Sequence, residues 1–293
     1  MPNGKRVNAA PGGGRKPSTN RPKPRAKLGQ NFLADRGAAQ RIVAALGDVS
    51  RSRVVEIGPG RGALTAELAQ RAGQLIAIEL DRVLAAQLRM KFAARPNVEI
   101  IEADILTIDL ANLLGPPVGQ LAGLSPAPVE PARVVGNIPY YITSDILLRL
   151  FSFHRLLSTI VIMVQKEVAD RIAAQPGGSE YGLLSATAQM YAQVEKLFTL
   201  PPGAFSPPPA VHSTVIRLSI APQFEKLAVA EQGFQDFLKL SFAQKRKTLI
   251  NNLKARYDDS KIKAALKAAG VRTDARAETL PLEKAAAVFR ALA

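Results

Sequence analysis

The sequence has 293 residues with a formal net charge of +15, two His, no Cys and no Trp. Without Cys, the chain can form no disulfide, thiolate nucleophile or Cys-ligated metal site, and with two distant His we expect no metal. Since 47% of the residues are apolar, the chain can bury a sizeable core, and its length suggests about two domains. No apolar run approaches the roughly 18 residues of a membrane span, so we expect no membrane association and a cytoplasmic location.

Positive charge is concentrated at the two ends of the chain. The first 27 residues contain eight Lys or Arg and no acidic residue, residues 28–221 are nearly neutral, and residues 222–293 carry six excess positive charges. Basic segments beside a neutral body favour nucleic-acid binding, because cationic side chains release counterions from phosphates. For the tail alone, a solubilising end is an equal alternative. The composition of residues 1–26 predicts a disordered tail.

The central body alternates short apolar runs with segments of helical periodicity, which predicts a parallel sheet covered by helices. Seven strands are predicted, at residues 54–57, 74–79, 98–102, 134–136, 159–164, 195–200 and 214–220. Helices are predicted around Ile42, Val43 and Leu46 and at residues 64–71, 82–91, 144–151, 167–174 and 184–192. Pro and Gly concentrate in residues 111–132, which we interpret as a surface loop.

Strand patterns disappear after Pro222, and apolar residues such as Phe234, Phe237 and Leu238 recur at helical spacing. We therefore predict a Rossmann-like α/β catalytic domain of seven strands over residues 27–221. A small all-helical domain over residues 222–293 is expected to bind nucleic acid, because of its excess positive charge.

The first strand leads into a Gly-Pro-Gly-Arg-Gly turn at residues 58–62, where glycines let the backbone approach a ligand closely. Glu79 ends the second strand, where a carboxylate can accept hydrogen bonds from both hydroxyls of a ribose. Asp104 follows the third strand. These strand ends predict an adenosine site but leave a nicotinamide cofactor and S-adenosylmethionine both open. Pro59 is a weak argument against a pyrophosphate, because it removes one backbone N–H from the turn.

The fourth strand leads into Asn137-Ile138-Pro139-Tyr140, at the sheet edge where open α/β folds hold substrates. If the target is the exocyclic amine of adenine, the Asn137 amide oxygen and the Ile138 carbonyl can each accept one N6 hydrogen. Tyr140 would then stack on the base. The alternative is an ordinary Asn turn followed by a buried Tyr. Phe205, on a proline-rich loop, either stacks on the opposite face of the base or fills the core.

Six segments occur in the order found in a known family: residues 27–33 (KLGQNFL), 55–60 (VEIGPG), 78–81 (IELD), 136–140 (GNIPY), 165–168 (QKEV) and 205–209 (FSPPP). Over about residues 25–255 the chain resembles the ribosomal RNA adenine dimethyltransferases. The triple proline after Ser206 is more similar to their small-subunit type. The basic tail, residues 1–24, and the segment 115–131 look longer than the family pattern, and we assign neither a role.

The resemblance implies transfer of methyl groups from S-adenosylmethionine to N6 of two adjacent adenosines in the 3′-terminal hairpin loop of 16S rRNA. Each adenosine would receive two methyl groups, within an immature small ribosomal subunit, and we expect the enzyme to be a monomer. By matching position, the implied cofactor-binding residues are Asn31, Leu33, Gly58, Glu79, Asp104 and Asn137. The implied catalytic residues that handle the adenine are Asn137, Tyr140 and Phe205.

The helical segment offers a candidate contact to the RNA backbone, formed by Lys245, Arg246, Lys247, Lys254 and Arg256. An ordinary solvated helix face is the alternative. Three other functions remain open: a large-subunit rRNA dimethyltransferase of the antibiotic-resistance type, a non-catalytic ribosome assembly factor and, more weakly, a nicotinamide dehydrogenase. Intact Glu79, Asp104 and Asn137 favour catalysis, and no acid/base pair for hydride transfer is evident.

Overall fold

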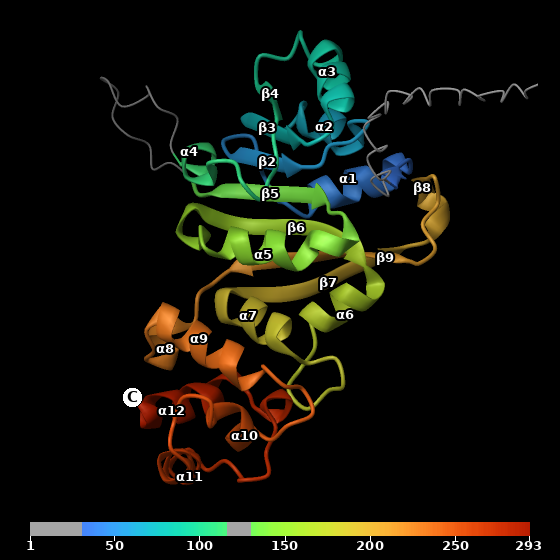
Figure 1. Ribbon diagram of the computed structural model, residues 1–293. Helices are drawn as coiled ribbons and strands as arrows, with labels where there is room; N and C mark the ends of the chain where they lie inside the picture. The colour runs from blue at the N-terminus through green and yellow to red at the C-terminus, as the bar shows by residue number, and fades with distance from the viewer. Residues whose placement is uncertain (1–30, 116–129) are drawn as a thin grey trace, which may run out of the picture.

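The computed structural model describes residues 31–115 and 130–293. Its centre is a seven-stranded sheet in the order β4-β3-β2-β5-β6-β9-β7 (Figure 1). The strands are β2 (Arg53–Ile57), β3 (Gln74–Glu79), β4 (Val98–Glu102), β5 (Ala132–Asn137), β6 (Leu157–Gln165), β7 (Ala192–Leu200) and β9 (Ser213–Ile220). All seven predicted strands are therefore confirmed.

The sheet is mixed rather than wholly parallel, which corrects the predicted pairing. The strands from β4 to β6 run parallel to their neighbours, whereas β9 is antiparallel to both β6 and β7. β7 reaches β9 through residues 201–212, with no helix crossing the sheet. Two strands joined without a crossover helix pair antiparallel, so this connection makes β9 run opposite to β7.

Helices cover both faces of the sheet because side chains alternate along each strand. In β2, Val54 packs with α1 (Arg36–Ala44) and α2 (Ala63–Leu68). The next residue, Val55, belongs to the core formed with helices on the other face. The remaining helices of the sheet region are α3 (Arg82–Lys91), α4 (Leu110–Leu114), α5 (Thr143–Phe151), α6 (Lys166–Ile172) and α7 (Leu183–Tyr191).

Two short elements were not predicted. The supposed loop 111–132 is helical at its start, because Asp109 caps α4 by accepting the backbone N–H groups of Ala111 and Asn112, at 3.1 and 3.3 Å. Most of the rest of that loop, residues 116–129, lies outside the described residues, as does the predicted tail 1–26. The second element is a two-stranded antiparallel ribbon of β1 (Phe32–Leu33) and β8 (Phe205–Ser206). Two residues per strand are too few to show a period.

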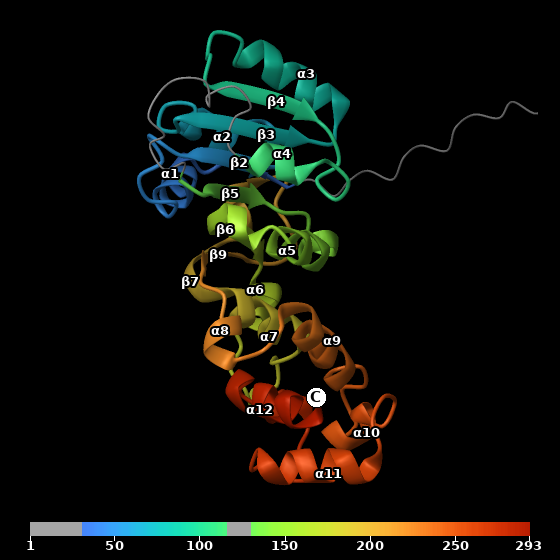
Figure 2. The same cartoon turned by 90° about the vertical axis from the view of Figure 1, so that its left-hand side faces the viewer.

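The helical character predicted for the C-terminal segment is confirmed, and the structure gives the bounds of its α-helices. They are α8 (Phe224–Leu227), α9 (Glu231–Ser241), α10 (Leu249–Leu253), α11 (Asp259–Ala268) and α12 (Leu282–Leu292). They lie beyond the β7 edge of the sheet (Figures 1 and 2). Among the described residues, no helix is long and apolar enough to cross a membrane.

One continuous hydrophobic core joins the sheet to these helices, through α7 and α9. Tyr191 at the end of α7 donates a hydrogen bond to the Glu231 carboxylate at the start of α9, at 2.8 Å. Burial, with a further contribution from Glu231, raises the pKa of Tyr191 above its ordinary value. The domain boundary at residues 221–222 stays a prediction, because no break in the core marks it.

The close approach of β2 and β5 generates a test. Gly136 pairs with Ile57, and a Cβ at Gly136 would lie 2.7 Å from the Ile57 carbonyl oxygen. We expect Gly136→Ala to lower the free energy of unfolding by about 1–3 kcal/mol, because the backbone must shift to accept the methyl group. Urea unfolding measures the change. Gly203→Ala is the control, since a Cβ there meets nothing within 4 Å; an equal decrease in both variants would contradict the argument.

Candidate functional site

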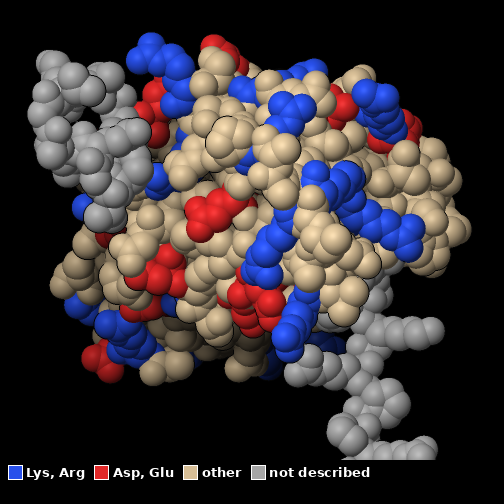
Figure 3. Space-filling view, turned by 90° about the horizontal axis from the view of Figure 1, so that it is seen from above, with Lys and Arg blue, Asp and Glu red and all other residues tan. Residues whose placement is uncertain are grey.

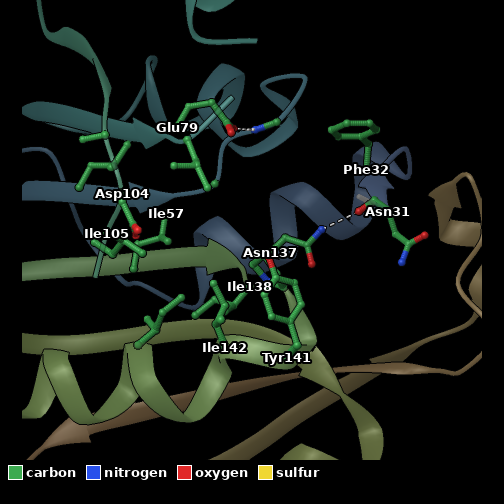
Figure 4. A pocket seen from close by; sticks show the side chains of 17 residues that line it. Asn31, Phe32, Ile57, Glu79, Asp104, Ile105, Asn137, Ile138, Tyr141 and Ile142 are labelled. Carbon is green, nitrogen blue, oxygen red and sulfur yellow. Dashed lines mark hydrogen bonds between the residues drawn. The ribbon is translucent and has the colours of Figure 1, made fainter. Parts of the chain in front are cut away.

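A pocket opens at the carboxyl ends of β2, β3, β4 and β5 (Figure 4). It contains about 910 Å³ of empty space, open solvent included. The structure brings five of the predicted residues into its lining: Asn31, Gly58, Glu79, Asp104 and Asn137. Parallel strands explain this convergence, since their carboxyl ends meet at one edge of the sheet.

The glycine turn forms the floor between β2 and α2. Gly58, Gly60 and Gly62 have φ values of 64°, 57° and 81°, a region that side chains disfavour. A Cβ on Gly60 would also lie 2.8 Å from the Phe32 ring. Gly60 is therefore required both by its backbone conformation and by the ring that packs on it.

Glu79 is held from two sides at the end of β3. Its Oε2 accepts the backbone N–H of Gly60 at 2.9 Å, and its Oε1 accepts that of Asp81 at 3.0 Å. The residue is only 4% exposed. Each carboxylate oxygen can accept more than one hydrogen bond, so the fixed carboxylate can still receive two hydroxyl groups of a ligand.

Asp104 lies among apolar side chains on the β4 side of the pocket. Its Oδ1 accepts the backbone N–H of Leu106 at 2.8 Å, which fixes the carboxylate. Apolar lining residues in the same pocket are Ile57, Ile78, Leu80, Ala103 and Ile105. An apolar slot with one carboxylate suits a flat heterocycle that carries an amine, such as adenine.

Asn137 ends β5 and has a defined amide orientation. Its Nδ2 donates a hydrogen bond to the Asn31 backbone carbonyl at 2.8 Å (Figure 4). A carbonyl can only accept, so this bond places the amide nitrogen toward residue 31 and leaves Oδ1 as the acceptor offered elsewhere. The backbone N–H of Ile138 donates to the Met163 carbonyl at 3.2 Å, which fixes the start of the turn against β6.

Leu33 and Phe205 are not among the residues that line this pocket, and the contact of Leu33 with the cofactor stays a prediction. They face each other in the β1–β8 ribbon and share a hydrophobic core, with exposed fractions of 8% and 4%. This burial favours the alternative interpretation of Phe205 as a core residue, and its contact with an adenine stays a prediction. The backbone of Tyr140 begins a 3₁₀ turn, η1 (Tyr140–Ile142), and its side chain lies outside the described part of the chain.

The predicted RNA-contact residues do not line the pocket and lie in turns of the C-terminal helical segment. Lys245, Arg246 and Lys247 are exposed in the turn between α9 and α10, not on a helix face as the alternative supposed. Lys254 pairs with Asp259 at 2.9 Å, and the Arg256 guanidinium lies 5.8 Å from the Tyr257 ring centre. The first three therefore remain the stronger candidates.

At the β4 edge of the sheet, basic and acidic side chains are mixed, unlike the basic cluster of Lys245, Arg246 and Lys247. Figure 3 views the protein from above Figure 1, at the β4 edge of the sheet, and shows Lys and Arg interspersed with Asp and Glu.

Among the described residues, no group of three or more His, Cys, Asp or Glu could hold a metal ion.

Comparison with known proteins decides the family. The family model described as "Ribosomal RNA adenine dimethylase" matches residues 21–293. The chain belongs to the ribosomal RNA adenine dimethylase family.

Relatives of this dimethylase match along nearly their whole length. "Ribosomal RNA small subunit methyltransferase A" of Koribacter versatilis is 59% identical over 272 residues, which cover 93% of this chain and 95% of the relative. The protein of the same name from Acidobacterium capsulatum is 52% identical over 267 residues, covering 91% and 90%.

Two solved structures are also similar to the dimethylase. The 23S rRNA methyltransferase ErmE has 29% sequence identity and a TM-score of 0.65, covering 89% of this chain and 99% of its own. A dimethyladenosine transferase from Plasmodium falciparum has a TM-score of 0.71 with coverage of 89% and 95%. Its 23% identity supports the fold alone.

The dimethylase family uses S-adenosylmethionine, and the pocket fits that cofactor. The fixed Glu79 carboxylate suits the ribose hydroxyls, and Asp104 with its apolar neighbours suits the adenine. The open backbone at Gly58 and the nearby Asn31 remain for the polar amino-acid end. These residues account for each part of S-adenosylmethionine, which contains no pyrophosphate.

Sequence reasoning missed two residues that shape the dimethylase pocket. The Phe32 ring lines the pocket, packs over Gly60 and lies 4.5 Å from the Arg61 guanidinium. Tyr141 lines the pocket next to Asn137 in Figure 4. Phe32 precedes the sheet, so no strand or helix periodicity indicates its place, whereas Tyr141 adjoins the Asn-x-Pro-Tyr turn and could have been considered.

A third missed residue, Glu56, lies buried beneath the glycine turn with an exposed fraction of 1%. The Thr65 hydroxyl donates a hydrogen bond to its Oε2 at 2.7 Å. Burial raises the pKa of Glu56 to about 8, against the effect of Thr65 and with a contribution from the Glu79 charge. At neutral pH the Glu56 carboxyl is therefore protonated.

The raised pKa of Glu56 predicts how stability depends on pH. Between its ordinary value of 4.5 and about 8, the folded state holds a proton that the unfolded state releases. Stability from this group is complete below the lower value and is lost as pH rises toward the upper one, by up to about 1.4 kcal/mol per pH unit. We expect Glu56→Gln to remove this loss.

Urea unfolding of both proteins at several pH values between about 5 and 9 measures the difference. The free energy of unfolding of the parent should fall relative to Glu56→Gln as the pH rises, then level off above about pH 8. Glu225→Gln, at an exposed position on α8, serves as the control and should follow the parent. Parallel curves for the parent and Glu56→Gln would refute the proposed protonation.

Proposed function

We propose that this dimethylase transfers methyl groups from S-adenosylmethionine to N6 of two adjacent adenosines in the 3′-terminal hairpin loop of 16S rRNA. It adds two methyl groups to each adenosine within an immature small ribosomal subunit, and it acts as a monomer in the cytoplasm. The observation that carries the proposal is the oriented Asn137 amide, which offers an acceptor oxygen beside a pocket suited to the cofactor. The relatives' shared name, small subunit methyltransferase A, supports the choice of RNA.

The chemical task is to activate a weak nucleophile. The N6 lone pair of adenine is delocalised into the ring, so the amine must move toward tetrahedral geometry before it can attack. In the first transfer, Asn137 Oδ1 and the Ile138 carbonyl accept one N6 hydrogen each and hold the lone pair out of the ring plane. The monomethylated amine keeps one N–H, which one of these acceptors holds in the second transfer, and each transfer releases one N6 proton to water. The hydrogen bond from Asn137 Nδ2 to the Asn31 carbonyl opposes rotation of the amide, so its oxygen remains the acceptor.

The remaining contribution of the chain is orientation and exclusion of water. S-adenosylmethionine supplies a methyl group already activated by its sulfonium, so no strong general base is needed. Apolar side chains such as Ile138, Ile142 and Ile146 line the pocket on the substrate side and keep the reacting groups dry. Holding two reactants in attack geometry can by itself supply much of a rate enhancement.

Methylation of large-subunit RNA is the second candidate. It is favoured by the similarity to the 23S rRNA methyltransferase ErmE, at 29% identity. The relatives named for the small subunit are 59% and 52% identical, and this difference favours the small subunit. The assembled pocket argues against a non-catalytic assembly factor.

Radiolabelled S-adenosylmethionine tests the proposal when the protein is incubated in parallel with unmethylated small subunits, large-subunit RNA and DNA. We expect label as N6,N6-dimethyladenosine at two adjacent positions in the 3′ hairpin of the small-subunit RNA. Label in large-subunit RNA would instead assign the second function. Small subunits that bind the protein without becoming labelled would indicate an assembly factor.

In the same assay we expect Asn137→Ala to lower the methylation rate by roughly 10²- to 10³-fold, because it removes an acceptor needed mainly as N6 changes geometry. RNA binding, measured by filter retention, should stay close to that of the parent. Asn112→Ala, at an exposed position on α4, controls for removal of an amide. An undiminished rate in Asn137→Ala would exclude the role given to this residue.

Replacement of Lys245, Arg246 and Lys247 by Gln tests the RNA-binding turn. We expect weaker binding and a shallower dependence of log affinity on log salt, by roughly 0.7–0.9 units for each phosphate that the variant no longer neutralises. The control replaces three exposed lysines elsewhere in the helical segment, Lys226, Lys261 and Lys267, with the same decrease in charge. If both triple variants change the slope equally, the turn has no specific role.

A further inference from the structure

Tyr141 is an exposed aromatic residue in the pocket wall. Its exposed fraction is 68%, although it lines the same pocket as Asn137 and Ile138. In Figure 4 its ring lies next to Asn137. An exposed aromatic ring buries little apolar surface and so stabilises the fold little. A contact with a ligand would explain why a large ring lies at the mouth of the pocket.

The position of Tyr141 separates it from the cofactor's adenosine. Asp104, Glu79 and Gly58 follow or end β4, β3 and β2, whereas Tyr141 lies four residues beyond the end of β5. The sheet order β4-β3-β2-β5 therefore places Tyr141 on the side of Asn137, at the far end from Asp104. This is the side on which the target amine must be presented.

The Tyr141 ring is available for stacking. Among the described residues, no ring contact, cation–π contact or hydrogen bond engages its side chain. Its backbone is nevertheless held, because Tyr141 lies inside the η1 turn that continues directly into α5. A free ring face on a fixed backbone is the arrangement on which single-stranded nucleobases stack.

We propose that Tyr141 stacks on the nucleobase adjacent to the adenosine being methylated. The inference rests on the proposed function and deepens it, because it names the contact that the neighbouring nucleotide makes. When one adenosine enters the pocket, the next base along the strand is one nucleotide step from the mouth. By stacking on this neighbouring base, Tyr141 separates it from the target base. This contact lowers the free-energy cost of extruding the target base.

The test compares Tyr141→Leu, Tyr141→Phe and Tyr141→Trp with the parent, using unmethylated small subunits. We expect Tyr141→Leu to raise the half-saturating subunit concentration on the order of 5- to 150-fold, which corresponds to removal of one base–aromatic stack. Phe and Trp keep an aromatic face and should remain within about threefold of the parent. The dissociation constant for S-adenosylmethionine alone, measured by calorimetry, should not change in any variant.

Leu148→Ala is the matched control, since Leu148 is a 44% exposed apolar residue on the following helix, α5, and does not line the pocket. It should behave as the parent does. Three results would overturn the inference: no change in Tyr141→Leu, an equal weakening in Tyr141→Phe, or a parallel rise in the dissociation constant for S-adenosylmethionine. If the parent binds subunits but methylates nothing, the proposed function fails, and subunit binding by the variants still decides the role of Tyr141.

Discussion

The register between β2 and β5 is the constraint on which the rest of the site depends. Ile57 lies opposite Gly136, and the missing side chain at Gly136 lets the two backbones come together. The strands therefore end side by side, and Gly58 and Asn137, which follow and end them, line the same pocket. A shift by one residue would turn the alternating side chains to the wrong faces of the sheet. One backbone contact thus positions both residues at the pocket.

Charge in the pocket is controlled by the contrast between two carboxyls. Glu79 accepts two backbone N–H groups and faces the pocket, whereas Glu56 is buried below it beside Thr65. Because desolvation keeps Glu56 protonated, its burial beneath the glycine turn adds no second negative charge near Glu79. The glycine turn can consequently pack tightly over an acidic residue, and the Glu79 carboxyl above it remains available for ligand hydroxyls.

The sequence predicts the features that apolar periodicity and the positions of strand ends reveal, which are the strands and the residues at their carboxyl ends. All seven strands were found, and Gly58, Glu79, Asp104 and Asn137 converge because strand ends meet at one edge of a sheet. A periodic pattern needs several repeats to be recognised, so the two-residue strands of the β1–β8 ribbon and the five-residue helix α4 were missed. It also cannot show which side of a loop faces inward. The sequence therefore left an adenine contact and a core position both open for Phe205, which pairs with Leu33 and is buried in the core.

The hydrogen bond from Asn137 to the Asn31 carbonyl joins residues 106 positions apart. The segment that supplies this carbonyl is itself held by Ala34 and Asp35, whose N–H groups donate to the Ala204 carbonyl. Contacts of such long sequence separation carry the largest loop-closure entropy cost. The amide is therefore oriented only after distant parts of the chain have met. Orientation of this amide therefore depends on the tertiary fold that joins residues 31–35, 137 and 204, and not on the β5 strand alone.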